Sequence, residues 1–483
     1  MHKKFLKNIS LILFLNILIK PLWVLGIDRV VQNKIGLSDY GFYYAIFNFT
    51  FLLNILLDFG ITNFNNKNIA QNNHLLRKHL SSIVMLKFIL AVIYLFVCLL
   101  VGFIIGYDSR HFIFLLALCF MQFLISLTMY LRSNLSGLHL FKLDSFMSIL
   151  DRLIMIVLCS VLLWGGLNIK FSVETYIVVQ LIGYFATTMI VLIVVFKKAK
   201  SRFLKLNWNL PFSVMIIKHS FPFAILILLM AFYNRIDTVL LERMLPDGEG
   251  AVQSGIYASA YRLLDATNML AFLFAGMLLP IFSRMLKLKE NVEQLVKMSY
   301  TLIIVPSIII SLASFFYSEE IMKLLYGDGH YMESAAVFRF IMFCFIPIST
   351  TYIFGTLLTA NSNLKALNIM AACGMCVNLI LNFILIPHYK AVGAAFASMS
   401  TQLITALVQV YIAKVKFDFK VNWRFLRTLA IFIFGVIGIS LLSKYFIHSW
   451  MVSIVVMGVV SLVWAVVSKI IDIKGFVEVL KNG

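Results

Sequence analysis

Apolar runs of about 18–25 residues recur along the whole chain, and short polar stretches separate them. Each run is long enough to cross the ~30 Å hydrocarbon core of a bilayer as a helix. The pattern therefore predicts an all-α, polytopic membrane protein with about 14 transmembrane helices. The helices are expected near residues 9–34, 41–64, 81–106, 112–137, 148–166, 172–196, 219–243, 253–281, 299–318, 335–360, 366–386, 391–413, 425–446 and 450–471.

The loops between these runs alternate in their content of basic residues. One set, which includes "HKKFLK", "KKAKSRFLK" and "KVKFDFKVNWRFLR", contains about 27 of the 41 Lys and Arg residues, whereas the opposite loops contain about 7. By the positive-inside rule both termini are expected in the cytoplasm. The first apolar run lacks a small-residue cleavage site, so it is interpreted as an uncleaved helix.

Composition supports this interpretation. The chain has 483 residues, of which 61% are hydrophobic and 13% charged, about half the charged fraction of a soluble domain. The net charge of +20 is explained by topology and by attraction to anionic lipid head groups, so nucleic acid is not an expected partner. No extramembrane segment is long enough for a catalytic domain. The six cysteines fall in predicted helices and are expected to pack there, although Cys373 and Cys376 form a C-x-x-C spacing.

A short pattern occurs twice. An I-D-x-V sequence with Asp28 or Asp237 is followed by a polar turn and then by a glycine before a tyrosine, Gly41 or Gly255. Six predicted helices separate the copies, so both run in the same direction across the membrane. This predicts a parallel repeat of two six-helix bundles, residues 1–205 and 206–418, followed by an appended helix pair and cytoplasmic tail, residues 419–483.

Charged residues interrupt several of the apolar runs. Each costs roughly 2.5–3.5 kcal/mol at the centre of a membrane helix, so such residues are expected to face a cavity between the bundles or to pair with one another. As cations that contact substrate we expect Lys20, Arg29, Arg235 and Arg262. As coupling or gating carboxylates we expect Asp28, Asp58, Asp237 and Asp265. Static ion pairing remains the alternative for each of them.

The C-terminal half contains further recognisable stretches: "LLYGDGHY", "LLTANSNLKALN", "NLILNFILIP" ending at Pro387, and "AVGAAFASMST". With "LGIDRVVQNKIGLSDYGFYYAIF" and "LLDFGITNFNNKNIAQ" near the start, the chain resembles the Wzx-like polysaccharide flippases of the multidrug/oligosaccharidyl-lipid/polysaccharide (MOP) exporter superfamily. The resemblance spans nearly the whole chain. The small residues after Pro387 also fit a close approach of two helices.

The resemblance implies a flippase that moves undecaprenyl-diphosphate-linked oligosaccharide, for O-antigen, capsule or exopolysaccharide, across the bacterial inner membrane. Its partners would be the lipid-linked oligosaccharide, membrane lipids, a coupling ion (H+ or Na+), and a polymerase and glycosyltransferases. No enzymatic activity, cofactor or metal is expected. The alternatives are a cation-coupled small-molecule exporter or a peptidoglycan-precursor flippase of the same fold, and then a membrane glycosyltransferase or polymerase. Glycan identity, coupling ion and oligomeric state stay open.

Overall fold

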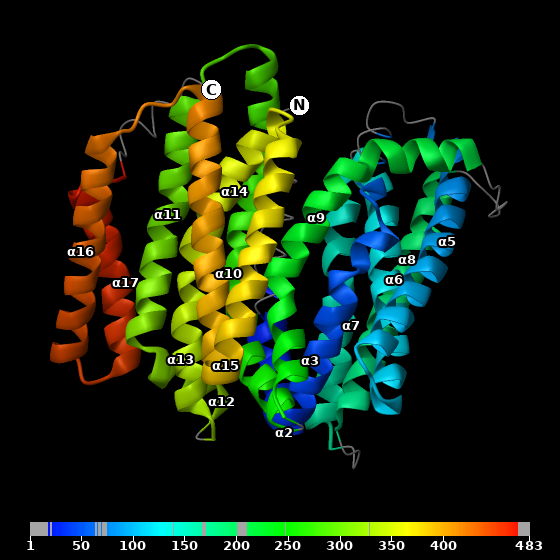
Figure 1. The fold of residues 1–483 in the computed structure, drawn as a ribbon, viewed down its shortest axis with the longest axis horizontal. Helices are drawn as coiled ribbons and strands as arrows, with labels where there is room; N and C mark the ends of the chain where they lie inside the picture. Colours follow the sequence, from blue (N-terminus) through cyan, green and yellow to red (C-terminus); the bar gives the residue numbers. More distant parts are fainter. Residues whose placement is uncertain are drawn as a thin grey trace. The chain divides into compact units, whose positions relative to one another are not determined.

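The protein is helical throughout the part of the chain that the computed structural model describes (Figure 1). The described residues are 18–19, 22–62, 65, 69, 75–138, 140–166, 171–199, 210–246, 248–327 and 329–471. Within them, ten helices are long and apolar enough to cross a membrane. The predicted all-α, polytopic membrane class is therefore confirmed. The chain forms two compact units, Met1–Gly255 and Ile256–Gly483.

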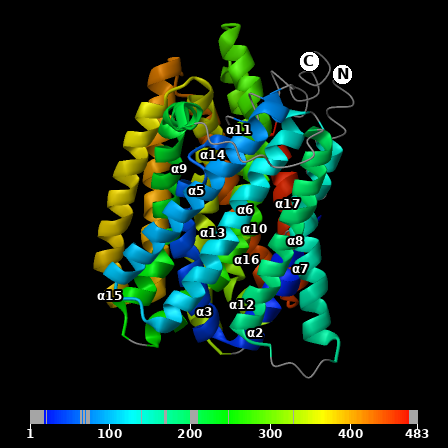
Figure 2. The same cartoon turned by 90° about the vertical axis from the view of Figure 1, so that its right-hand side faces the viewer.

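The first unit is built around α3, most of whose residues are buried. Both α6 and α9 pack against α3, and α8 packs against α6 and α7 (Figure 2). Burial on several sides explains why α3 has no distinct polar face, since a helix that is apolar all round lies inside a bundle. The elements of this unit are the π-helix η1 (Leu22–Asp28), α2 (Arg29–Ile35), α3 (Leu37–Leu52), the 3-10 helix η2 (Asn54–Leu57), α5 (Leu75–Ile104), α6 (Ser109–Gly137), α7 (Phe141–Trp164), α8 (Val173–Ala199) and α9 (Leu210–Met244).

The helix α10 (Glu249–Lys287) crosses the boundary between the units. In the second unit, α14 packs against α11 and α15, and α13 packs against α12 and α15. The other elements of this unit are α11 (Glu293–Phe316), α12 (Ser318–Tyr326), α13 (Tyr331–Phe343), α14 (Phe345–Ala360), α15 (Leu364–Phe417), α16 (Trp423–Phe446) and α17 (Trp450–Val467).

A sharp bend divides α15 into two arms. Lys390 has a non-helical backbone with φ 51° and ψ −131°, within the gap expected between the eleventh and twelfth predicted helices. Helical structure continues through Pro387 to this bend, a few residues beyond the predicted end. A side chain at Gly393 would place its Cβ atom 2.6 Å from the carbonyl oxygen of Leu385, so the arms approach closely beside the bend. The small-residue stretch is thus required where it was expected.

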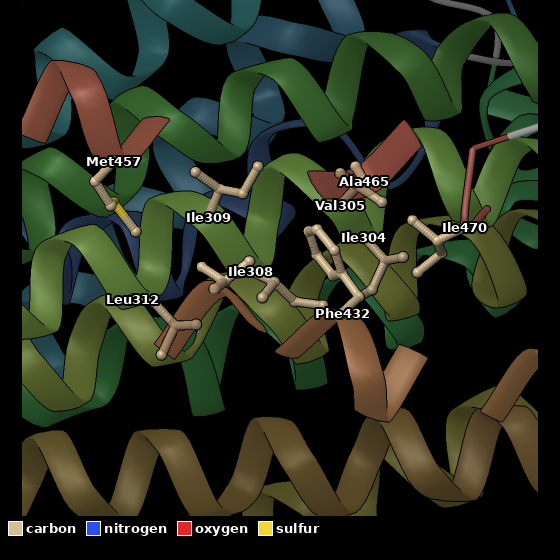
Figure 3. Close-up of a cluster of buried hydrophobic side chains, with 10 residues drawn as sticks. Ile304, Val305, Ile308, Ile309, Leu312, Phe432, Met457, Ala465 and Ile470 are labelled. Carbon is tan, nitrogen blue, oxygen red and sulfur yellow. The ribbon is translucent and has the colours of Figure 1, made fainter. Parts of the chain in front are cut away.

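The final helices, α16 and α17, lie side by side and pack against α11 (Figure 1). A buried apolar cluster joins the three (Figure 3). It consists of Ile304, Val305, Ile308, Ile309, Leu312, Phe432, Val436, Met457, Ala465 and Ile470. Tyr317 adds a polar contact, because its hydroxyl lies 2.6 Å from that of Ser453 and 3.0 Å from that of Ser443. The expected appended pair therefore belongs to the packed core of the second unit.

Two predicted spans are interrupted. The helix expected over 41–64 ends at Leu52 and gives way to η2, so Asp58 lies in a turn and not in a helix. The run expected over 335–360 is divided at Cys344 into α13 and α14. Hydropathy averages over a window and does not register such breaks, because apolar residues predominate around them. The predicted division at residues 205/206 remains a prediction.

Candidate functional site

Asp28 is a carboxylate buried inside the first unit. It ends η1, just before α2 begins, and its side chain is about 1% exposed. The hydroxyl of Tyr40, from α3, donates to Asp28 Oδ2 at 2.8 Å, and the hydroxyl of Tyr176, from α8, donates to Oδ1. Three separate elements thus meet at one acid, and two neutral hydroxyl groups replace the water that its charged form would need.

Aromatic rings surround the bonds of Asp28. Trp23 stacks on the Tyr176 ring at a centroid distance of 6.2 Å, and Tyr43 meets the same ring edge-on at 5.4 Å. The side-chain amide of Gln180 donates to the hydroxyl of Tyr43 at 3.0 Å. These rings exclude bulk water while keeping their polar ends bonded. The result is a buried cluster of hydrogen-bonded polar groups around Asp28.

Arg29 follows Asp28 directly and starts α2. Its side chain is partly buried, yet within the described part of the chain its buried Nε atom has no hydrogen-bond partner. A buried donor left without an acceptor costs about 1–3 kcal/mol, and more if charged. The Nε of Arg29 is therefore a donor whose hydrogen bond an acceptor able to enter this buried region would satisfy. A guanidinium is matched to phosphate oxygens, which it can bind through two parallel bonds.

Arg235 and Asp237 lie on α9, which packs against α3. The Arg235 guanidinium is 5.3 Å from the centroid of the Phe51 ring, and its Nη1 lies 3.5 Å from the hydroxyl of Tyr44. Asp237 is about 1% exposed. Tyr44 in turn stacks on Tyr40, with ring centroids 6.2 Å apart. The partner of Arg235 and a partner of Asp28 therefore lie on neighbouring turns of α3.

A second polar contact joins the same pair of helices, since the Asn48 amide donates to the Thr238 hydroxyl at 2.9 Å. The glycines of the repeated pattern also meet in this unit. A Cβ atom on Gly41 would lie 1.9 Å from the carbonyl oxygen of Ala251, and one on Gly255 would lie 2.2 Å from that of Leu37. Glycine is needed at both positions because two backbones are in contact there.

Asp58 has a partner that sequence reasoning missed. Lys87, on α5, is about 1% exposed, and its ammonium donates to Asp58 Oδ1, to the Leu57 carbonyl at 2.9 Å and to the Ser126 hydroxyl at 3.0 Å. Asp58 also accepts from the Thr62 hydroxyl at 2.5 Å. All three ammonium donors have acceptors, as a buried lysine requires. The signal was a single lysine inside an otherwise apolar run, which is itself unusual.

His111 forms another contact that the sequence analysis did not identify. Its Nδ1 lies 2.8 Å from Asp108 Oδ1 and its Nε2 lies 3.0 Å from Glu242 Oε1, so it joins the start of α6 to the end of α9. Asp108 caps α6 by accepting the backbone N–H of His111, and the hydrogen bonds from His111 lower the pKa of this exposed carboxyl below its ordinary value. An acid three residues before a histidine was the available signal.

The remaining predicted residues lie elsewhere. Arg262 and Asp265 are partly exposed on α10 in the second unit, and Lys20 lies outside the described residues. In the described ranges, no group of three or more His, Cys, Asp or Glu side chains is arranged to hold a metal ion. Cys373 and Cys376 are both exposed and unbonded. The structure thus places four of the eight predicted site residues, Asp28, Arg29, Arg235 and Asp237, around α3 or next to it.

A family model described as "Polysaccharide biosynthesis protein" matches residues 5–286, more than half of the chain. The chain belongs to this family. No curated protein sequence matches it significantly. The resemblance to polysaccharide flippases, drawn from stretches inside this range and from others C-terminal to it, is therefore confirmed at the level of the family.

Solved structures share the fold. A lipid II flippase, MurJ, in an inward closed conformation has a TM-score of 0.69 at 14% identity, covering 95% of this chain and 98% of its own. An inward-facing multidrug resistance MATE transporter of the MOP superfamily has a TM-score of 0.64 at 13% identity. The match covers 83% of this chain and 94% of the transporter. A MOP superfamily transporter from Pyrococcus furiosus has a TM-score of 0.61 at 14% identity. The match covers 85% of this chain and 95% of that transporter. At such low identity the likeness establishes the fold alone; the matched proteins are a flippase and two transporters.

Proposed function

We propose that the protein is a flippase that moves a lipid-linked oligosaccharide, carried on a polyprenyl diphosphate, across the bacterial inner membrane. Family membership supports polysaccharide biosynthesis as the process, and the MOP fold supports transport as the activity. The observation that carries the proposal is Arg29, a partly buried cation whose Nε atom lacks an acceptor among the described residues. A guanidinium is suited to the diphosphate of the proposed substrate.

We assign the coupling role to Asp28. Tyrosine hydroxyls accept hydrogen bonds as well as donate them, so Tyr40 and Tyr176 can stay bonded whether Asp28 is charged or protonated. Asp58 instead forms an ion pair with the buried ammonium of Lys87, and breaking such a pair is strongly destabilising. Asp58 is therefore assigned a structural role. Asp237, Asp265, Arg235, Arg262 and Lys20 remain candidate contributors without an assigned step.

The substrate assignment is tested by complementation of a strain that lacks its own flippase, with glycan display normalised to the amount of protein in the membrane. Arg29→Ala should reduce display of the native glycan and of an accepted foreign glycan alike, because a phosphate contact does not depend on the sugar. Arg29→Lys should retain part of the activity, because lysine keeps the positive charge but cannot form the bidentate hydrogen bonds that a guanidinium makes with phosphate. Arg110→Ala, at an exposed ion pair with Asp39 in the same unit, is the control and should leave display unchanged.

Loss of display for only one glycan in Arg29→Ala would place Arg29 at the sugar and contradict the assignment. The coupling assignment is tested separately, in vesicles with an imposed proton or sodium gradient. Asp28→Asn should abolish the dependence of transport on the gradient, while Asp39→Asn, an exposed carboxylate of the same unit, should not. Full gradient dependence in Asp28→Asn would show that coupling resides elsewhere.

The other functions of the fold are distinguished by substrate. A small-molecule exporter would restore drug resistance to a sensitive strain and leave glycan display absent. A peptidoglycan-precursor flippase would support growth when the host's own flippase for that precursor is depleted; the MurJ structure is named a lipid II flippase. The family match favours the polysaccharide assignment over both.

A further inference from the structure

A groove runs between the two arms of α15, on the second unit. Its volume is about 340 Å³, at the small end for ligand pockets. One wall contains Ile369, Cys373 and Val377, spaced four residues apart on the first arm. Ile404, Val408 and Ile412, with the same spacing, form the other wall. Thr405, also in the lining, satisfies its hydroxyl by donating to the Gln402 carbonyl at 3.0 Å. The groove is thus apolar and contains no polar group in need of a partner.

Both walls lead to lysines at the same end of the arms. Lys365 precedes Ile369 by one helical turn, and Lys416 follows Ile412 by one turn. Because the chain reverses direction at Lys390, these two lysines lie at the end of the hairpin away from the bend (Figure 1). Both are exposed, and neither has an ion-pair partner among the residues that the structure describes. Lys414 and Lys420 add positive charge at this end, and Asp418 supplies one carboxylate.

The length of the groove matches one leaflet. From Lys365 to Val377 the first arm rises ~18 Å at 1.5 Å per residue. Half of a ~30 Å hydrocarbon core is ~15 Å, the depth that one acyl chain spans. A polyprenyl chain of the proposed substrate is longer than one leaflet and would extend well beyond the groove. The small volume and the short length both favour a single acyl chain.

We propose that this groove binds an anionic glycerophospholipid, with one acyl chain between the arms of α15 and its phosphate near Lys365 and Lys416. The apolar walls supply burial for the chain and the lysines supply charge complementarity for the head group. The site lies within the second unit and does not depend on the proposed transport function. It would make the packing of the α15 hairpin sensitive to the lipid composition of the membrane.

The chain contains its own probe for this site. Cys373 lines the groove, whereas Cys376, three residues later and also exposed, does not. Both are alkylated by a maleimide in detergent micelles, and mass spectrometry of the peptides gives the rate at each. Added phosphatidylglycerol should slow alkylation of Cys373 at least ~10-fold relative to Cys376, and phosphatidylcholine should protect much less. Lys365→Gln combined with Lys416→Gln should weaken phosphatidylglycerol binding roughly 30-fold, as expected for two lysines near anionic head groups.

Ile404→Trp should fill the groove and remove lipid-dependent protection, while Leu403→Trp, at the neighbouring exposed position that does not line the groove, is the matched control. Size-exclusion profiles report whether each variant is folded, and the wild-type comparison of Cys373 with Cys376 needs no variant. Equal effects of the lipid at both cysteines would overturn the proposal. So would protection by phosphatidylcholine as strong as by phosphatidylglycerol. Stronger protection by a polyprenyl phosphate than by phosphatidylglycerol would assign the groove to the substrate instead.

Discussion

Replacing Lys87 with methionine should destabilise the first unit by removing one side of a buried ion pair. Lys87 is about 1% exposed, whereas Asp58 is 25% exposed and keeps its bond from Thr62. Breaking a buried pair costs about 3–5 kcal/mol, because it leaves an uncompensated charge. Since Asp58 retains some water and one other donor, Lys87→Met should cost about 3 kcal/mol, at the lower end of that range. Asp58→Asn leaves the fully buried ammonium behind and should cost more, up to about 5 kcal/mol.

The double variant separates a structural pair from a functional acid. Lys87→Met combined with Asp58→Asn removes both charges, so its loss should be smaller than either single loss, with a coupling energy of at least ~2 kcal/mol. Unfolding in mixed micelles with increasing sodium dodecyl sulfate, followed by tryptophan fluorescence, measures the free energy of unfolding of the two single variants and the double variant. Arg110→Met and Asp39→Asn provide a matched cycle at an exposed pair, where the coupling should not exceed ~1 kcal/mol.

Additive losses at Lys87 and Asp58 would refute the reasoning, since independent sites do not compensate each other. A single loss below ~1 kcal/mol for Lys87→Met would also refute it, because a surface ion pair behaves in that way. Gradient-driven transport measured on the folded double variant adds a functional test. Retained gradient dependence supports the structural role of Asp58, and its loss at normal stability would return Asp58 to the coupling candidates.

Two further predictions concern individual glycine positions, one for packing and one for topology. Gly41→Ala should destabilise the protein by about 1–3 kcal/mol in the same unfolding assay, because its Cβ atom would lie 1.9 Å from the Ala251 carbonyl, whereas Gly438→Ala, with open space around it, should be neutral or slightly stabilising. Equal effects would show that the contact relaxes freely. Cysteines placed at Gly248 and Gly329 in a background without native cysteines should react with a membrane-impermeant thiol reagent in intact spheroplasts, and labelling only after lysis would reverse the predicted topology.

Hydropathy and charge distribution were sufficient for the membrane class and for most helix positions. They succeed because the bilayer imposes length and apolarity on every span independently of its neighbours. The recurrence of Gly41 and Gly255 in the repeated pattern was also visible in the sequence, and the structure supplies its reason, since each contacts a facing backbone. These features are local, or depend on one helix at a time.

The partners of the buried charges were not predictable in this way. Tyr176 reaches Asp28 from a helix almost 150 residues later, and Lys87 reaches Asp58 across a break that hydropathy did not register. In both cases the pairing depends on which helix faces which, and on the rotation of each about its axis. The apolar pattern leaves both undetermined when a helix is apolar on every side, as α3 is.

Arg29, proposed to contact the diphosphate, follows directly after Asp28, proposed to couple transport to the ion gradient. Adjacent residues on a helix point about 100° apart, so Asp28 and Arg29 face different surroundings and need not neutralise each other. They also occupy the junction of a π-helix with α2. π-Helices are rare in proteins as a whole, and those that occur are often found at functional sites. If protonation of Asp28 changes its bonds to Tyr40 and Tyr176, the same short segment carries that change to Arg29. A single helical junction would then connect the ion gradient to the cation proposed to hold the diphosphate.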